Sequence, residues 1–157
     1  MTGVTVGIEA PQQAEVLGLL RQSDAYSASL YPVEGRKPLG TEALSAPSVH
    51  FLVARLGEVA VGCCALIEQG SGMGELKRMI VDEDARQQGV GRALLIAIEA
   101  VAVRIGLHLI QMEVGARSTG AHALYRRAGY RDRGPFGTHR LSPYSIFLEK
   151  QVGPGAA

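Results

Sequence analysis

The sequence has few cysteines, and the two it has are adjacent. Cys63 and Cys64 cannot build a disulfide framework, and they lack the paired spacing of a zinc site. No apolar run approaches the roughly 20 residues that cross a bilayer. The N-terminus has Glu9 early and lacks the basic start and apolar stretch of a secretory signal. We therefore expect a cytoplasmic protein with reduced thiols and no membrane partner.

Neither sign of charge is in excess. Sixteen Lys and Arg residues face fifteen Asp and Glu residues, for a net charge of +1. A general nucleic-acid or membrane-surface binder needs a broad basic field, so we predict no nucleic-acid partner. The four histidines share no i, i+4 spacing, so we predict no metal site; they are His50, His108, His122 and His139.

The length and composition indicate one globular domain. The chain has 157 residues, of which 46% are hydrophobic and 20% charged, and a chain of this size buries a sizeable core without disulfides or metals. We expect a single domain over residues 1–157, with a disordered tail from residue 152. The 20 glycines are not periodic, which suits turns and places where the backbone approaches something closely.

Hydrophobic periodicity and turn residues predict an alternation of strands and helices. The predicted strands cover residues 3–9, 50–55, 58–67, 75–81, 107–114 and two short stretches within 130–150. The predicted helices cover residues 11–30, 41–44, 90–105 and 119–127. This order predicts an α/β fold, a mixed β-sheet with helices on both faces. The unit over residues 75–114 should pair its two strands in parallel.

The segment GELKRMIVDEDARQQGVGRALL, residues 74–95, is typical of an anion site. The first turn of a helix has unpaired N–H groups and a partial positive charge. Gly89 and Gly91 would let a phosphate reach those groups, and Arg86 and Arg92 would add charge at the rim. A tight turn that needs small residues explains the glycines equally well.

Two other phosphate motifs do not fit this segment. A P-loop needs Gly-Lys-Ser/Thr, whereas Gly91 is followed by Arg92-Ala93. A dinucleotide fingerprint needs a third glycine at the place that Leu94 occupies. A nucleotide-binding α/β module is therefore disfavoured.

Two motifs about 30 residues apart carry a family resemblance. RQQGVG at residues 86–91 resembles the acetyl-CoA loop of the GNAT superfamily of N-acetyltransferases, and AHALYRRAGY at residues 121–130 resembles that family's A-x-x-L-Y-x-x-x-G-F/Y segment. GELKRMIVD, GPFG and SIFLEK further resemble a subgroup of small bacterial acetyltransferases. The predicted element order also matches, so the resemblance covers nearly the whole chain and implies a GNAT-like acyl-CoA N-acyltransferase fold.

The resemblance implies acetyl-CoA as co-substrate. The strand over residues 76–81 would carry a bulge and diverge from the next strand, and the pantetheine arm would pair with backbone at Met79, Ile80 and Val81. The pyrophosphate would lie on N–H groups beside Arg86, those of Gln87, Gln88, Gly89, Val90, Gly91 and Arg92. Many members have Asn at the position of Ser118, where it contacts the cofactor; serine is shorter but can still donate a hydrogen bond and cap the helix.

The implied reaction is direct attack of a primary amine on the thioester, which needs a base for the amine and a proton for the thiolate. Tyr125 holds the family position whose phenol reaches the CoA sulfur, so it is the predicted acid; the alternative is a packing aromatic. Glu75 is the predicted base. Its alternative is a strand carboxylate paired with Lys77, and other members remove the proton through ordered water.

The acceptor should bind where the family varies, near the first two helices and the 134–140 loop. Residues 23–32 are rich in hydroxyls and include Asp24, Tyr26 and Tyr31, which suits a small polar amine. No acidic run is present for a basic protein tail, so we expect a small molecule or amino acid. His139, after the GPFG segment, is interpreted as a surface loop histidine; the alternative is a residue that lines the substrate mouth.

Two expectations concern assembly and activity. The family often dimerises, and Phe136 and Phe147 could form an exposed apolar patch, so we expect a homodimer. The competing function is a catalytically decayed CoA-binding regulatory module. Retention of Glu75 and Tyr125 together with both loop glycines disfavours it.

Overall fold

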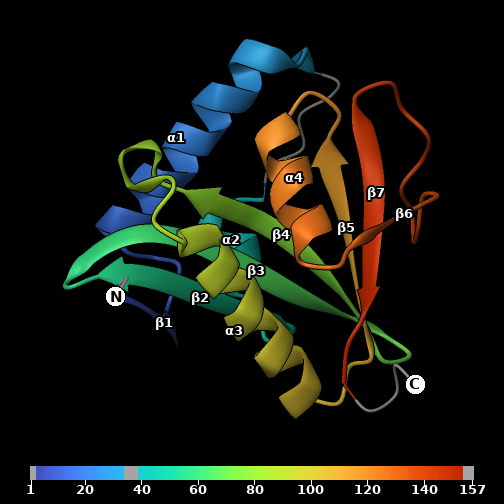
Figure 1. The fold of residues 1–157 in the computed structure, drawn as a ribbon, viewed down its shortest axis with the longest axis horizontal. Coiled ribbons are helices and arrows are strands. Elements are labelled where there is room, and N and C mark those ends of the chain that lie inside the picture. The colour runs from blue at the N-terminus through green and yellow to red at the C-terminus, as the bar shows by residue number, and fades with distance from the viewer. Residues whose placement is uncertain (1–2, 34–38, 154–157) are drawn as a thin grey trace.

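The computed structural model describes residues 3–33 and 39–153, and within them seven strands form one sheet in the order β1-β2-β3-β4-β5-β7-β6 (Figure 1). The strands are β1 (Val4–Ile8), β2 (Val49–Leu56), β3 (Val59–Gly70), β4 (Met73–Val81), β5 (Leu109–Gly115), β6 (Arg131–Arg133) and β7 (Ser145–Gln151). The helices are α1 (Ala14–Leu30), α2 (Thr41–Leu44), α3 (Val90–Arg104) and α4 (Thr119–Arg127). The predicted order and fold class are confirmed.

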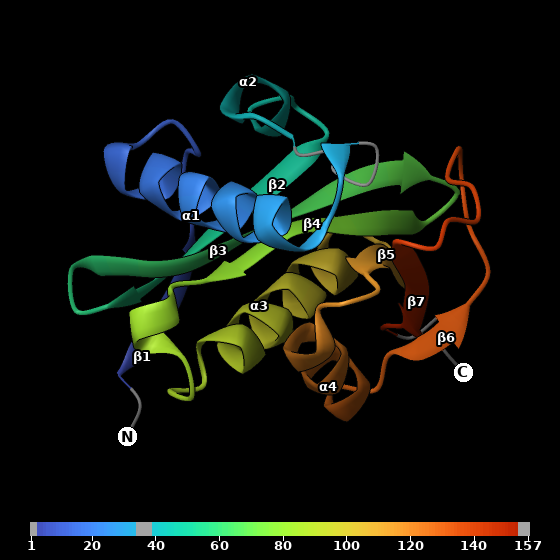
Figure 2. The ribbon, with the colours of Figure 1, turned by 90° about the horizontal axis from the view of Figure 1, so that it is seen from above.

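The helices cover both faces of the sheet, as predicted. Figure 2 shows α1 and α2 on one face and α3 and α4 on the other. Each face has its own core: Cys64 packs in the α3 cluster and Cys63 in the α1 cluster, so the two side chains point to opposite faces. Burial raises the pKa of Cys63 to about 12 and raises that of Cys64 well above its usual value. Both cysteines are therefore unreactive packing residues.

A small residue lets α3 lie close to the sheet. The apolar stripe of α3 is buried, as the hydrophobic periodicity of residues 90–105 predicts, and includes Leu94 and Ile98. A Cβ built on Gly62 of β3 would lie 2.9 Å from the Val90 side chain and 2.8 Å from the Ile80 carbonyl oxygen. The glycine thus fixes the distance between the start of α3 and the strand beneath it.

The strands β4 and β5 run parallel but pair only at their beginnings. The ladder joins Met73–Glu75 to Leu109–Gln111 and then stops. On its other edge β4 carries a bulge: Ile80 pairs with Cys63 and Lys77 with Ala65, so Arg78 and Met79 together oppose Cys64. Arg78 has a left-handed φ of 55°, which is strained for a side chain of this size. The predicted bulge and divergence are both present.

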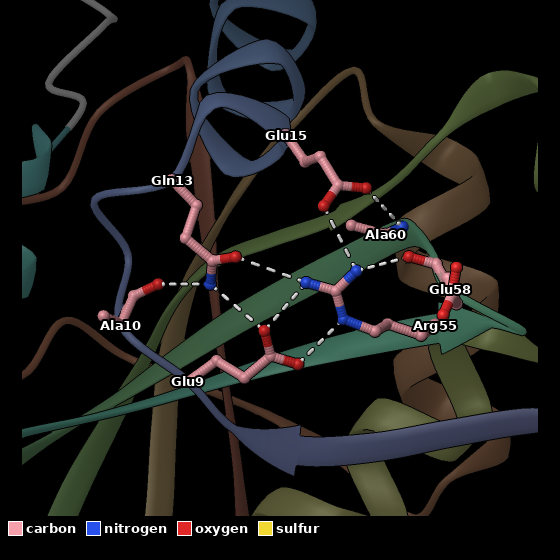
Figure 3. A network of polar contacts seen from close by, with 7 residues as sticks. All are labelled: Glu9, Ala10, Gln13, Glu15, Arg55, Glu58 and Ala60. Carbon is pink, nitrogen blue, oxygen red and sulfur yellow. Dashed lines mark hydrogen bonds and ion pairs between the residues drawn. The ribbon is translucent and has the colours of Figure 1, made fainter.

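Arg55 ties the first strand and the first helix to the sheet (Figure 3). Its guanidinium binds both carboxylate oxygens of Glu9, at 2.8 and 3.0 Å, and one oxygen of Glu15 at 3.2 Å. It also donates to the Glu58 carbonyl at 2.6 Å. Hydrogen bonds from Arg55 lower the pKa of Glu9, and hydrogen bonds from the Ala60 N–H and Arg55 lower that of Glu15.

Two predictions about exposed segments are wrong. Phe136 and Phe147 do not form a surface patch: both are buried and contact each other edge-to-face at 5.9 Å. The homodimer therefore stays a prediction without that support. The predicted disordered tail also begins too early, because Val152 is buried and its N–H donates to the His108 carbonyl at 2.8 Å. Residues 154–157 lie outside the described residues.

No described helix is both long enough and apolar enough to cross a membrane.

We expect Arg55→Met to lower the thermal midpoint at pH 7, because it removes one cation shared by two carboxylates. A glutamate whose pKa is lower in the folded than in the unfolded protein stabilises the fold at pH values above its unfolded pKa of about 4.3. This stabilisation is lost as the pH falls through the folded pKa, because the carboxylate is then protonated. The difference in thermal midpoint between wild type and variant should therefore become smaller below about pH 4. Thermal melts from pH 3 to 7 measure this, with Arg21→Met on the exposed face of α1 as the control; an unchanged difference at pH 3 would contradict it.

Candidate functional site

A cleft of about 860 Å³ opens where β4 and β5 diverge. The floor consists of residues 76–79 of β4 and 112–115 of β5. Its walls come from the C-terminal half of α1, from the start of α4 and from the loop over residues 138–144. These five segments therefore border one space at the gap in the sheet.

The β4 edge that faces the gap is free to pair with an extended ligand. Beyond Glu75, β4 has no β5 partner in the described ladder, so backbone groups on that edge can act as a sheet edge does in strand addition. Of the three residues predicted to contact pantetheine, Met79 lines the cleft. Ile80 and Val81 do not line it, and their cross-strand neighbours are Cys63 and Gly62.

The predicted anion loop has the expected backbone form. Gly89 is the N-cap of α3 with φ 80°, and Gln87 has φ 65°, so the chain turns sharply into the helix. No hydrogen bond from the first-turn N–H groups of Val90, Gly91 and Arg92 occurs within residues 3–33 and 39–153. The loop residues with exposed side chains are Arg86, Gln87, Gln88 and Arg92, and Gly89 is exposed too.

Gly91 has a packing role in addition to the predicted one, which stays a prediction. It is buried, and a Cβ there would lie 2.8 Å from Leu124 Cδ2 of α4. Its missing side chain therefore lets α3 and α4 approach one another. Gly89, with its left-handed φ, is the glycine that the loop conformation itself requires.

Tyr125 lies on α4 and lines the cleft, although its residue is only 6% exposed. Its ring contacts Tyr130 edge-to-face with centroids 6.0 Å apart. The hydroxyl has no hydrogen-bond partner among the described side chains and backbone groups. Burial raises the pKa of Tyr125 above its usual value. The phenol therefore stays protonated at neutral pH and has a proton to donate.

Ser118 also lines the cleft, as the N-cap of α4. Its hydroxyl makes no capping bond to the helix; it lies 3.2 Å from the Tyr31 hydroxyl. The Tyr31 hydroxyl also accepts a hydrogen bond from the Arg117 N–H at 2.8 Å. Ser118 thus joins the end of α1 to the start of α4, and the predicted side-chain cap is absent.

Glu75 is the last residue of β4 that pairs with β5, where its partner is Gln111, and it is 6% exposed. Its oxygens contact three side chains: Gln69 at 3.3 Å, His139 at 2.8 Å and Lys77 at 3.5 Å. The predicted alternative, a pair with Lys77, is therefore present. Glu75 is not among the residues that line the cleft, whereas Lys77 and His139 both line it.

The cleft also contains Glu113, for which the sequence predicted nothing, and His139, for which the cleft was the alternative interpretation. His139 is not a surface histidine: its side chain is 18% exposed, and its Nδ1 lies 3.5 Å from Glu113 Oε1. Glu113 was given no role, and its alternation with Gln111 along β5 was the only available signal. The contact between His139 and Glu113 joins a loop to a strand residue 26 positions earlier, and sequence spacing does not predict contacts between residues so far apart. Within the described residues, no three His, Cys, Asp or Glu side chains are grouped as a metal site.

The acceptor side of the cleft partly matches the prediction. Asp24 and Tyr31 of the first helix region line it, as do residues 138–145. Tyr26 is exposed and outside it. Asp24 pairs with Arg78 at 2.8 Å, so the bulge residue and α1 are joined by an ion pair at the cleft wall.

Comparisons with known proteins agree with this geometry. The profile of the acetyltransferase (GNAT) family matches residues 19–130. An IAA acetyltransferase of Azospirillum brasilense is 42% identical over 153 residues, which cover 97% of this chain and 100% of the relative. An uncharacterised N-acetyltransferase of Bacillus subtilis, YsnE, is 28% identical and covers 88% of this chain and 93% of that protein.

Solved structures show the same fold. A Klebsiella pneumoniae protein described as an acyl-CoA N-acyltransferase superposes with a TM-score of 0.82 at 33% identity, over 97% of this chain and 99% of that chain. The PaiA N-acetyltransferase of Thermoplasma acidophilum, solved with coenzyme A, has a TM-score of 0.75 at 14% identity, over 95% and 99%. The fold is the GNAT acyl-CoA N-acyltransferase fold, and the chain belongs to the GNAT family as an acetyl-CoA-dependent acetyltransferase.

Proposed function

We propose that this enzyme transfers acetyl from acetyl-CoA to the primary amine of a small molecule or amino acid, by direct attack of the amine on the thioester. The observation that carries the proposal is the cleft through the gap between β4 and β5. An extended ligand on the β4 edge would place its thioester in the gap, and an amine from the opposite side would meet it there. The name of the Azospirillum relative adds IAA to the acceptors to be tested.

Three parts of the chain would hold acetyl-CoA. The first turn of α3 offers unpaired N–H groups and the positive end of the helix, which suits the pyrophosphate. Arg86 and Arg92 are exposed at this turn and would add charge. The β4 edge at Met79 would pair with the pantetheine arm, and Ser118 would contact the cofactor from α4.

The bulge and Tyr125 would share the chemistry. A bulge takes backbone groups out of the ladder, so an N–H near Ile80 would polarise the thioester carbonyl and stabilise the developing oxyanion. Tyr125, protonated and without another partner among the described residues, would give its proton to the departing thiolate. The expected product pair is an N-acetyl compound and free CoA.

Thiol release with acetyl-CoA and a panel of amines tests the proposal directly. The panel should contain amino acids, aryl and alkyl amines, a lysine-containing peptide and IAA. Release that depends on one small amine supports the proposal. Release with the peptide alone would move the target to a protein amine. Tight acetyl-CoA binding with no release would support the competing regulatory module.

We expect Arg92→Glu to weaken acetyl-CoA binding, because it removes a cation from the anion loop and opposes the helix dipole. A charge-assisted hydrogen bond contributes about 1.5–3 kcal/mol, so the dissociation constant should rise roughly ten- to a hundredfold. Calorimetry measures it. Arg104→Glu, at the opposite end of α3, makes the same change in net charge and is the control; an equal effect of both variants would contradict the loop assignment.

We expect Tyr125→Phe to slow transfer at least about tenfold while acetyl-CoA affinity and stability barely change. The substitution keeps the ring that contacts Tyr130 and removes only the hydroxyl. Steady-state rates with the best acceptor measure the effect, and the exposed Tyr26→Phe is the control. Full activity in Tyr125→Phe would make the residue a packing aromatic.

A further inference from the structure

A polar cluster lies on the α1 side of the sheet, at the point where β4 and β5 part. The loop over residues 134–144 brings His139 down between Glu75 of β4 and Glu113 of β5. His139 Nε2 lies 2.8 Å from Glu75 Oε2, and Nδ1 lies 3.5 Å from Glu113 Oε1. Nothing in the family resemblance or the comparisons gives His139 or Glu113 a role.

Aromatic packing fixes the imidazole in this place. The ring of Phe136 lies 4.8 Å from that of His139, and the ring of Phe147 lies 5.8 Å from it. Both phenylalanines are buried. The His139 ring is therefore held from behind, while the residue still lines the cleft.

The carboxylate oxygens of the two glutamates differ in the hydrogen bonds and ion pairs that they make. Glu75 contacts Gln69 through Oε1 and both His139 and Lys77 through Oε2. Glu113 receives a hydrogen bond from the Ser145 hydroxyl on Oε2 at 2.7 Å, and its Oε1 lies 3.5 Å from the imidazole. Among the described residues no group donates a hydrogen bond to Glu113 Oε1, so this oxygen has its acceptor capacity left, and its residue lines the cleft.

The hydrogen-bond inventory assigns the proton on the neutral ring. A carboxylate only accepts, so the 2.8 Å contact with Glu75 places the proton on Nε2. Nδ1 then presents a lone pair, and it faces Glu113 Oε1, which is also an acceptor. A donor placed beside this 3.5 Å contact can bond to both acceptors. A primary ammonium, with three donors and a positive charge, is such a donor.

We propose that the acceptor's ammonium binds at Glu113 Oε1 and His139 Nδ1, and that Nδ1 takes its proton, directly or through one water. Glu75 is then a positioning residue: it holds the tautomer and stabilises the imidazolium, as the carboxylate does in a serine protease triad. This assignment rests on the proposed function, and it replaces Glu75 as base because Glu75 does not reach the cleft.

Each proton of this reaction can be followed from donor to acceptor. His139 removes one proton from R–NH₃⁺, and the neutral nitrogen forms a C–N bond with the acetyl carbonyl carbon. The C–S bond breaks with its electron pair on sulfur, and Tyr125 protonates the thiolate. The nitrogen then loses its second proton, and water carries this proton to the Tyr125 phenolate, which becomes a phenol again. His139 returns its proton to solvent. The products are the amide, CoA–SH and one H⁺.

The decisive comparison is His139→Gln against His50→Gln. His50 is a matched control, because it contacts Glu68 at 2.7 Å on β2, outside the cleft. General bases contribute about 10²–10⁴-fold, so we expect kcat at pH 7 to fall about 10²-fold in His139→Gln and to stay unchanged in His50→Gln. Calorimetry with acetyl-CoA should give the wild-type affinity for both, which shows that they are folded.

The pH dependence separates a base from a structural residue. An alkyl amine has a pKa of about 10.4 and becomes neutral without help as the pH rises, so the ratio of wild-type to His139→Gln rates should shrink from pH 7 to pH 10. The charged groups around the ring are Glu75 and Lys77 from β4 and Glu113 from β5; Phe147 of β7 and Phe136 of the loop are neutral. A ratio that stays constant over this range would overturn the proposal.

Glu113→Gln tests the proposed binding of the ammonium, because it removes the negative charge and keeps the length of the side chain. Losing a charged hydrogen bond costs about 1.5–3 kcal/mol, so KM for the amine should rise at least about tenfold with a smaller change in kcat. Glu75→Gln should lower kcat more than it raises KM. If wild type acetylates an amine and His139→Gln keeps its kcat, the proposal is wrong although the proposed function stands. If wild type uses no amine, the proposed function fails first.

Discussion

The separation of β4 from β5 is the constraint on which the rest of the structure depends. Parallel pairing ends after Glu75 and Gln111, and the bulge at Arg78 and Met79 bends β4 away on its other edge. A continuous ladder would close the sheet and leave no passage. The gap instead exposes a free backbone edge and joins the two faces of the sheet in one cleft. The strained φ of Arg78 is the local cost of that opening.

The two faces meet at this cleft with different chemistry. The face covered by α3 and α4 contributes the open first turn of α3 and the phenol of Tyr125, which suit an anionic cofactor with a thiol leaving group. The opposite face contributes Glu113 and His139 beneath a loop, which suit a cation that must lose a proton. The sheet separates these two groups of residues, and the gap between β4 and β5 brings them to one cleft.

Long-range contacts connect the cleft walls to one another and to the sheet. Tyr31, at the end of α1, reaches Ser118 and the Arg117 N–H at the start of α4. Asp24 pairs with Arg78 at the bulge, and Arg55 anchors the beginning of α1 to β2. Each contact joins segments far apart in sequence, so helix α1 is held at both ends relative to the sheet. Fixed walls let positioned side chains act without reorganising when substrates bind.

The sequence by itself determined what depends on local spacing. Helical periodicity predicted α3, turn residues predicted the order of strands and helices along the chain, and the RQQGVG and AHALYRRAGY segments predicted the start of α3 and the helix α4 that carries Tyr125. Only the tertiary structure decided the rest. Gly91 packs on Leu124, Glu75 turns to His139, and Phe136 and Phe147 are buried together. These outcomes follow from which elements touch across the fold, and such contacts between distant residues leave no periodic signal in the sequence.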